Sequence, residues 1–423
     1  MLPAAQLPSV IEAILPPVET TPAIRKTPLN SAHRQLGAKM VEFNGWDMPV
    51  EYAASIGCGI IAEHMAVRTG VGIFDVSHMG DIRLAGGEAL ASVQHISMND
   101  ASRLAIGQAQ YSALLYPQGT FVDDVIVHRL GDEEYLLVIN AGTREKDFNW
   151  VRDNTREFDC AVDNLSDDYT QIAIQGPKAI DLMRKLSQSP LRMEGTAGDS
   201  FSFRSISFPD VSALKFYWFT HGQIETTNGG HKQNSEFMVA RTGYTGEDGF
   251  EIYVPSDETT SARVWNEVLD LGKDFGAVPC GLGARNTLRL EAKLPLYGHE
   301  ISDTINVWEA RLDRFCKTEK PGFIGREALE KARAAGITRT LVGLEMVERG
   351  IARDGYRILN IDGREVGYVT SGSPAPFLKK NIALAYVPIE MGGNGTELLV
   401  EIRGQGMRAK IVPTPFYKKP KRT

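Results

Sequence analysis

Residues 109–140 read AQYSALLYPQGTFVDDVIVHRLGDEEYLLVIN. Three runs rich in aliphatic, aromatic and β-branched residues are separated by two short turn segments, PQG at 117–119 and GD at 131–132. Such runs joined by short turns predict an antiparallel meander of three strands. Asp123 and Asp124 stand in the middle run, although strands disfavour aspartate. The meander therefore raises the question of what two adjacent carboxyl groups do inside a sheet.

Neighbouring residues of a strand point to opposite faces of the sheet, so only one of the two carboxyl groups can enter a given pocket. Asp123 is expected on the face of Val125, and Asp124 on the face of Val122 and Ile126. In one interpretation, one aspartate caps the preceding turn and the other is solvated. In the other, one carboxylate serves a functional pocket. The pattern alone does not say which aspartate that would be.

The rest of the chain predicts a mixed architecture. Residues 59–70, 141–155 and 281–294 have helical spacing, and residues 71–86 read as a strand. From Thr340 onward, short strands recur at regular spacing with glycine turns, which predicts a barrel-like or sandwich-like C-terminal module. The strand–helix alternation before it is too irregular for a doubly wound parallel sheet. The expected fold class is therefore α+β followed by an all-β module.

Composition narrows the functional classes. The 423 residues are 43% hydrophobic and carry a net charge of −7, which argues against non-specific nucleic-acid binding. No apolar run approaches the roughly 18 residues typical of a membrane span. The four cysteines are far apart and form no CxxC pair, so we expect reduced thiols in the cytoplasm and no metal cluster. Residues 1–26 lack the basic start of a secretory signal and are expected to be a loosely ordered extension, or the result of a start codon placed too early.

Three further positions could carry chemistry. Glu247 lies in the glycine-rich turn RTGYTGEDGFEIYV (241–254), either as an ordinary exposed residue or as a carboxylate aimed at a polar ligand edge. Arg285, near the start of a predicted helix, could bind a carboxylate ligand or pair with a nearby acid. His78 is a lone histidine without metal-ligand spacing, and such residues are more often structural.

Taken together and in order, many segments resemble one family, the folate-dependent aminomethyltransferases that include the T-protein of the glycine cleavage system. The similarity spans residues 27 to about 329 and continues more weakly to PTPFYKK near the C-terminus. The segments that carry it include VEFNGWDMPVEY, GIFDVSHMGDI, GQAQYSALL, VDDVIVHR, YLLVINAGTREKDFNWV, IAIQGPKA, RTGYTGEDGFEIYV, GLGARNTLRLEAKLPLYGHEI and FIGREAL.

This resemblance implies a three-domain cloverleaf around a central tetrahydrofolate site, with antiparallel sheets and a C-terminal barrel-like module. The expected division is a discontinuous folate-binding α+β domain at 27–80 and 166–335, a second α+β domain at 81–165 with the catalytic aspartate, and a barrel domain at 336–423. An N-terminal extension at 1–26 is expected to precede these three domains.

The resemblance also implies an activity. The one-carbon unit of an aminomethyl group on the lipoyl arm of the H-protein passes to tetrahydrofolate, and ammonia leaves, without a metal. No nucleic acid or membrane partner is expected. A fixed carboxylate in a water-poor pocket would stabilise the cationic carbon that forms as ammonia departs.

Matched residue by residue, the family's catalytic aspartate falls on Asp123, which leaves Asp124 a structural role. Its ligand-contacting glutamate, arginine and asparagine fall on Glu247, Arg285 and Asn140. The remaining expected substrate- or cofactor-binding residues are Tyr111, Met79 and Tyr417.

The chain departs from the family pattern near the predicted substrate side. Asn286 stands where an aspartate is usual, and Lys293 replaces a glycine. Arg311 and Arg314 occupy positions where small and aromatic residues are usual. One hypothesis is that these basic residues recruit an acidic H-protein or the polyglutamate tail of folate.

Two other functions compete with glycine cleavage. A sister folate-dependent demethylase would share the folate site and act on a small methylated donor. A non-catalytic folate-binding protein of iron–sulfur assembly would carry a cysteine in the segment KPGFIGREAL, which has none here.

Overall fold

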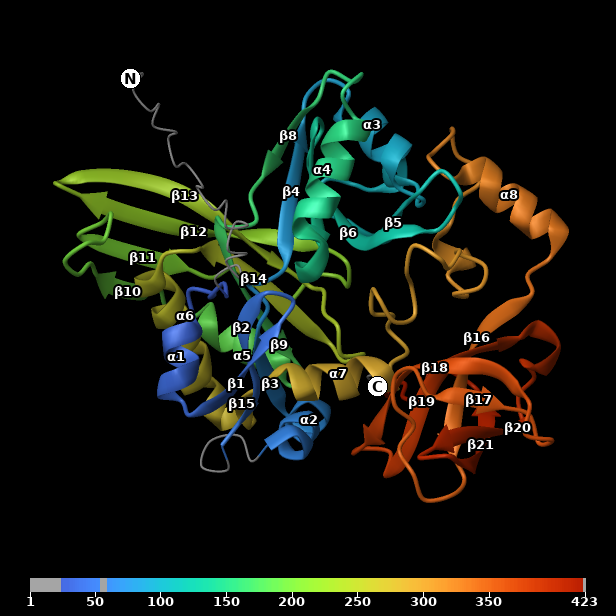
Figure 1. The fold of residues 1–423 in the computed structure, drawn as a ribbon. Helices are drawn as coiled ribbons and strands as arrows, with labels where there is room; N and C mark the ends of the chain where they lie inside the picture. The colour runs from blue at the N-terminus through green and yellow to red at the C-terminus, as the bar shows by residue number, and fades with distance from the viewer. Residues whose placement is uncertain (1–23, 54–58, 421–423) are drawn as a thin grey trace, which may run out of the picture.

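The computed structural model describes residues 24–53 and 59–420, which form three lobes (Figure 1). The largest lobe contains an eight-stranded sheet in the order β10-β11-β12-β13-β14-β9-β3-β15. Neighbouring strands are antiparallel except for β15 beside β3. The strands are β3 (Val71–Asp75), β9 (Tyr169–Gln175), β10 (Leu191–Glu194), β11 (Phe203–Ser207), β12 (Phe219–Asn228), β13 (His231–Ala240), β14 (Gly249–Pro255) and β15 (Ala277–Pro279).

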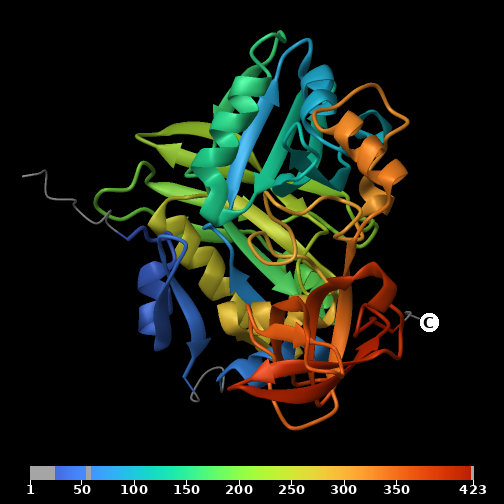
Figure 2. The same ribbon diagram turned by 45° about the vertical axis from the view of Figure 1, so that its right-hand side comes forward.

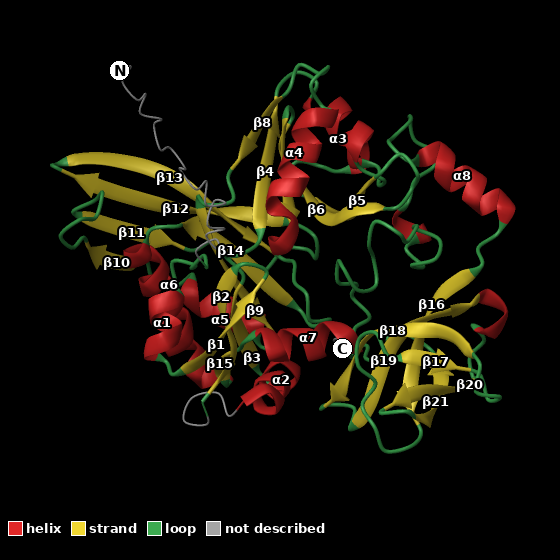
Figure 3. Cartoon of the chain, in the orientation of Figure 1, coloured by secondary structure: helices red, strands yellow, loops and turns green. Residues whose placement is uncertain are grey.

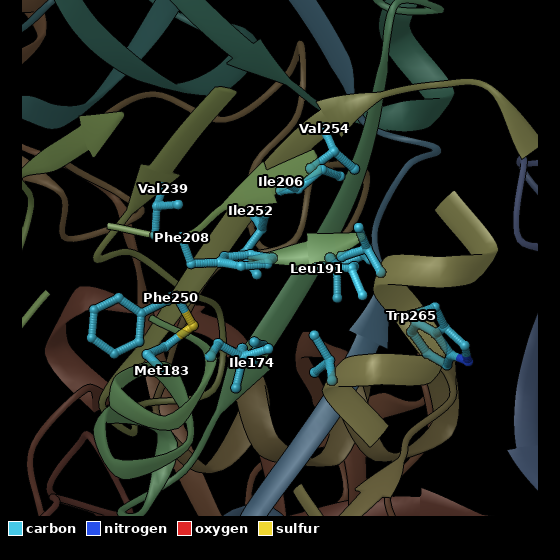
Figure 4. Close-up of a cluster of buried hydrophobic side chains, with 14 of the residues drawn as sticks. Ile174, Met183, Leu191, Ile206, Phe208, Val239, Phe250, Ile252, Val254 and Trp265 are labelled. Carbon is cyan, nitrogen blue, oxygen red and sulfur yellow. The ribbon is translucent and has the colours of Figure 1, made fainter. Parts of the chain in front are cut away.

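Alternation along the strands gives this sheet two different faces. Ile172 and Ile174 of β9 join the main core with Trp265, on the face covered by α5 (Ala179–Leu186) and α6 (Glu258–Gly272) (Figure 4). Ala173 lies between them in sequence and instead joins Leu288 on the opposite face, covered by α2 (Gly59–Thr69) and α7 (Leu282–Glu291). The sheet is therefore buried on both sides, and α7 is held close to the centre of the molecule.

The second lobe confirms the meander predicted from residues 109–140, which forms β5, β6 and β7. Its five-stranded sheet has the order β5-β6-β7-β4-β8, and helices α3 and α4 pack against it (Figure 3). The elements are β4 (Gly80–Ala85), α3 (Ala89–Ile96), β5 (Ala109–Leu115), β6 (Phe121–Gly131), β7 (Glu134–Ile139), α4 (Arg144–Asn154) and β8 (Ala161–Asn164).

The single strand predicted for residues 71–86 is wrong, because this segment forms β3 and β4 in two different sheets. The chain turns after Asp75, whose carboxylate accepts hydrogen bonds from the N–H and the hydroxyl of Ser77 at 2.9 and 2.6 Å. Such local side-chain bonds to the backbone favour a turn over a continuing strand. The turn carries the chain from the first lobe into the second and places Met79 between them.

Asp75 is also the centre of a buried polar cluster. It accepts hydrogen bonds from Thr27 at 2.6 Å and from His33 at 2.8 Å, and Tyr52 contacts the other ring nitrogen of His33 at 2.8 Å. Burial acts to raise the pKa of Asp75, but the bonds and charge of His33, together with Ser77 and Thr27, hold it at about 2. The cluster fastens α1 (Asn30–Gln35) and the hairpin of β1 (Ala38–Phe43) and β2 (Trp46–Tyr52) to the large sheet.

The third lobe is a closed six-stranded barrel, which confirms the predicted C-terminal β module. Helix α8 (Arg326–Ala335) precedes it, and Figure 2 shows the barrel in red below this helix. The predicted extension at 1–26 lies largely outside the described residues. The barrel strands are β16 (Arg339–Met346), β17 (Arg357–Leu359), β18 (Glu365–Ala375), β19 (Lys380–Pro388), β20 (Glu397–Ile402) and β21 (Gln405–Val412).

Candidate functional site

A pocket lies where the two sheets and α7 meet. Its walls include apolar and aromatic side chains from both sheets, among them Ile126, Val138 and Tyr253. Polar groups converge on it from the meander, β14 and α7, and Met79 of the β3–β4 turn lies beside them; the polar residues are Tyr111, Asp124, Asn140, Glu251 and Arg285. An apolar pocket with a few convergent polar groups is the usual form of a small-molecule site.

The structure separates the two adjacent aspartates. Asp124 lines the pocket, whereas Asp123 is 0% exposed and does not. Asp123 faces the helix-covered side with Val125, as the alternation predicts, but Val122 joins that side as well. The reason is a bulge, because Leu114 pairs with Asp123 whereas Leu115 pairs with Phe121. The bulge shifts the alternation at its site, and the strand beyond it directs Asp124 into the pocket.

Asp124 is held by two donors. The hydroxyl of Tyr111 donates to one carboxylate oxygen at 3.1 Å, and the side-chain amide of Asn140 donates to the other at 2.8 Å. Burial, followed by the charge of Asp123, raises the pKa of Asp124 to about 7 despite these bonds. The group can therefore change its protonation state near neutral pH, as a group that exchanges a proton during a reaction must do.

Asp123 belongs to a closed hydrogen-bond network behind the pocket. It accepts from the backbone N–H of Asn140 at 3.0 Å, from its side-chain amide at 2.8 Å and from the hydroxyl of Thr143 at 3.0 Å. Burial and the neighbouring carboxyl group of Asp147 raise the pKa of Asp123 well above its ordinary value. Because Asn140 donates to both aspartates, Asp123 fixes the amide that in turn orients Asp124. The catalytic role expected for Asp123 stays a prediction. The position of Asp123 behind the pocket does not favour that role.

Glu247 and Tyr417 lie outside the pocket. Glu247 is only 8% exposed and pairs with Arg68 at 3.0 Å, so it is not the exposed tip of a hairpin. Arg68 also bonds Glu291 at 2.9 Å, and its guanidinium carbon lies 3.9 Å from the ring centre of Tyr417. These residues tie α2, α7, the 241–248 turn and the C-terminal segment together. Their contacts are those of an anchoring cluster.

Glu251 and Tyr244 are pocket residues that the sequence comparison missed. In β14, Phe250 and Ile252 face the main core, so Glu251 must face the other way, and this alternation was a usable signal. The hydroxyl of Thr242 donates a hydrogen bond to Glu251. Burial raises its pKa, against the opposing effects of that bond and of the charge of Arg285.

Arg285 takes its predicted place in the pocket wall. Its guanidinium carbon lies 4.3 Å from the ring centre of Tyr244, and burial lowers its pKa. Within the described part of the chain, no carboxylate forms an ion pair with it. Arg285, Met79 and Asn140 also line a second hollow, bounded by Asn44, Gly142 and Tyr297. The pocket and the second hollow therefore share these three side chains.

His78 is buried beside this second hollow, with its ring 5.8 Å from that of Phe43. Burial, and then the charge of Arg285, lower its pKa to about 3. It is therefore neutral at physiological pH and packs as an aromatic group. None of the described helices is both long and apolar enough to span a membrane.

Comparison with known proteins gives a consistent result. Residues 29–320 match the family model of the GCVT N-terminal domain, and residues 339–418 match that of the glycine cleavage T-protein C-terminal barrel domain. The chain is 62% identical to an aminomethyltransferase of Koribacter versatilis (strain Ellin345) over 408 residues, which are 96% of this chain and 99% of the relative. It is 61% identical to an aminomethyltransferase of Acidobacterium capsulatum over 95% of this chain and 98% of the relative.

A solved structure is similar as well. The crystal structure of glycine cleavage system aminomethyltransferase T from Bartonella henselae superposes with a TM-score of 0.79 at 30% identity. The match covers 93% of this chain and 98% of the other. The similarity thus includes the large lobe, the meander lobe and the barrel.

Proposed function

Because the chain belongs to the glycine cleavage T-protein family and is an aminomethyltransferase of that system, we propose that the pocket between its two sheets is the active site. The observation that carries this proposal is the convergence of Asp124, Glu251 and Arg285 in one apolar pocket. These three side chains come from β6, β14 and α7, which lie far apart in the sequence.

Tetrahydrofolate is the acceptor that the pocket residues fit best. A flat heteroaromatic ring suits walls made of Tyr111 and Tyr244, and Glu251 can accept two N–H groups from the edge of an aminopyrimidine. The guanidinium of Arg285, which has no ion-pair partner among residues 24–53 and 59–420, can bind an electronegative edge of the same ligand. Tetrahydrofolate would supply the nucleophilic nitrogen that takes up the one-carbon unit.

We assign the catalytic carboxylate to Asp124. Loss of ammonia from an aminomethyl thioether creates positive charge on carbon, and an ionised Asp124 in an apolar pocket stabilises that charge better than water does. Tyr111 and Asn140 hold both carboxylate oxygens in position before the charge develops. With a pKa of about 7, Asp124 can also accept a proton from a cationic amine.

We propose that the lipoyl arm of the H-protein approaches through the second hollow. The hollow shares Met79, Asn140 and Arg285 with the pocket, so an extended arm that enters it reaches the vicinity of Asp124. The acceptor and the donor would then use separate approaches to one reacting centre.

Reconstitution tests these assignments together. The protein is mixed with tetrahydrofolate and aminomethylated H-protein, and ammonia and methylenetetrahydrofolate are measured. We expect both products in equal amounts, and none when the H-protein lacks its lipoyl group. Methyl transfer from a small methylated donor without the H-protein would instead indicate the demethylase reaction.

We also propose the domain division 27–80 with 166–335, 81–165, and 336–423, which follows the three lobes. A cytoplasmic location is proposed because Cys160, Cys280 and Cys316 are free thiols, as expected in a reducing compartment.

A further inference from the structure

A third carboxyl group, that of Asp147, lies behind the pocket next to Asp123. It comes from α4, whereas Asp123 comes from β6, and both side chains are fully buried. The two carboxyl groups are in hydrogen-bond contact with each other. Two ionised carboxylates have no hydrogen to donate, so this contact requires a proton between them. One of the two groups is therefore a carboxylic acid in the folded protein.

The surroundings of Asp147 place this proton on Asp123. The ammonium group of Lys146 lies 3.5 Å from one oxygen of Asp147 and donates to the hydroxyl of Tyr297 at 3.0 Å. A cation this close favours the ionised form of Asp147. With Asp123 ionised as well, neither oxygen of Asp147 has a well-formed hydrogen bond among the described residues, and a buried carboxylate without one is costly. A proton on Asp123 supplies that bond.

The pKa values of the pair shift in the directions that this arrangement requires. Burial, and then the charge of Asp147, raise the pKa of Asp123 well above its ordinary value. Burial also raises the pKa of Asp147, but the hydrogen bond from Asp123 and the charge of Lys146 oppose that rise. Asp123 is thus the member of the pair that keeps the proton.

Asn140 connects this pair to the pocket. Its side-chain nitrogen donates to Asp123 and to Asp124 at 2.8 Å each, so the two acceptor oxygens are no farther apart than twice that distance. Two negative charges this close in a buried site repel each other strongly. A full charge on Asp123 would therefore favour the protonated form of Asp124, which is the form that cannot stabilise a cation.

Other titratable and charged groups also face the three carboxyl groups. They are Lys146 of α4, Arg285 of α7, Tyr111 of β5, and Tyr217, Tyr244 and Tyr297. Burial raises the pKa of each of these tyrosines, so their hydroxyls stay neutral near pH 7. Lys146 acts on Asp147, and Arg285 acts on Asp124. The protonation of Asp123 therefore depends chiefly on its two aspartate neighbours.

We propose that Asp147 is a positioning residue that keeps Asp123 a neutral carboxylic acid, so that Asp124 carries the negative charge that faces the pocket. This inference rests on the proposed function, because it requires Asp124 to be the catalytic carboxylate. A neutral Asp123 still accepts the hydrogen bonds of Asn140 and Thr143. The amide that orients Asp124 is thus held in place without a second charge beside it.

Asp147→Asn tests this inference through the pH dependence of turnover. Asparagine carries no charge, and its amide can donate to Asp123, so Asp123 should ionise in this variant. The acid limb of kcat/KM, expected near pH 7 in the wild-type enzyme, should then move to higher pH by roughly 1–2 units. At neutral pH this shift lowers kcat/KM by about 5- to 50-fold, and the loss should be recovered as the pH rises.

Asp153→Asn is the matched control, because Asp153 also belongs to α4 but is exposed. This variant removes the same charge from the same helix and should keep the wild-type midpoint of the acid limb. A purely structural role of Asp147 would lower kcat/KM by the same factor at every pH. An unchanged midpoint in a folded Asp147→Asn enzyme would therefore overturn the inference.

Infrared spectroscopy tests the shared proton without any turnover. With isotopically labelled aspartate, the wild-type enzyme at pH 8 should show the C=O stretching band of a protonated aspartate that is missing from both Asp147→Asn and Asp123→Asn. A wild-type spectrum identical to that of Asp123→Asn would overturn the inference, even if Asp147→Asn does not fold. Either negative result would leave the proposed function intact. Absence of folate-dependent ammonia release by the wild-type enzyme would instead refute the proposed function.

Discussion

Replacement of Asp124 by asparagine should abolish most turnover, and the pH dependence of the wild-type enzyme should identify the group responsible. The ordinary pKa of this carboxyl group is 3.8, and the pocket raises it to about 7. If the ionised form is required, the active fraction falls to about one tenth at pH 6 and about one hundredth at pH 5. The acid limb of kcat/KM should therefore have a midpoint near pH 7.

The asparagine variant keeps the shape of the side chain but cannot stabilise a cation. Loss of one preorganised electrostatic group typically lowers kcat by about 10²- to 10³-fold. The variant should remain folded, because a raised pKa means that the ionised carboxylate destabilises the native state. Between pH 3.8 and about 7 the folded protein binds a proton that the unfolded chain releases, so stability falls as pH rises through this window. Asp124→Asn should therefore show an equal or higher Tm at pH 8.

Asp123→Asn is the matched comparison. Since Asp123 does not line the pocket and affects the pKa of Asp124 less than burial does, this variant should keep more turnover than Asp124→Asn, and any shift of the acid limb should be to lower pH. The assay follows ammonia release from aminomethylated H-protein between pH 5 and 9, in enzyme whose folding is checked by circular dichroism. Full activity in Asp124→Asn together with an inactive, folded Asp123→Asn would refute the assignment and restore the one drawn from sequence similarity.

Glu247→Gln should lower stability by about 1–3 kcal/mol in urea unfolding while turnover per folded molecule is retained, because the substitution weakens the Arg68 cluster; a raised folate KM with unchanged stability would contradict this. Gly142→Val should raise the KM for the H-protein and not for folate, because a Cβ at this position meets the side chain of Asn44 at 3.0 Å and narrows the second hollow. An equal rise of both KM values would argue against separate approaches for the lipoyl arm and folate. The pKa of Asp75 is lowered to about 2. Above pH 4 the ionised carboxylate therefore adds about 2–3 kcal/mol to the free energy of unfolding, and this contribution is lost as pH falls from 4 to 2. In Asp75→Asn the free energy of unfolding should change less between pH 4 and 2 than in the wild-type protein. The same dependence on pH in both proteins would disprove this role of Asp75.

The sequence predicted the fold well where local signals were strong. The meander of β5 to β7 follows from short turns between apolar runs, and the barrel follows from regularly spaced short strands. The break between β3 and β4 was missed because the whole segment is apolar enough for a strand. What divides it is a hydrogen bond from Ser77 to Asp75, which depends on the partners that bury Asp75.

The site was predicted less completely, for the same physical reason. Alternation showed that Asp123 and Asp124 face opposite sides, but which side becomes a pocket depends on where the large sheet and α7 pack. Glu247 and Glu251 are both carboxylates of one turn-and-strand segment. Only the packed structure shows that Glu247 forms an internal ion pair with Arg68. Glu251, in contrast, lines the pocket.

The C-terminal segment has a mechanical consequence for the barrel. After β21 the chain returns to the large lobe, where the ring of Tyr417 covers Arg68. The backbone N–H of Tyr417 donates to the backbone carbonyl of Glu291 at 2.8 Å. The barrel is therefore tethered at both of its ends, by the connection after α8 and by this returning strap. A rotation of the barrel about the first connection would have to break these contacts, so the returning strap favours one orientation of the barrel relative to the large lobe.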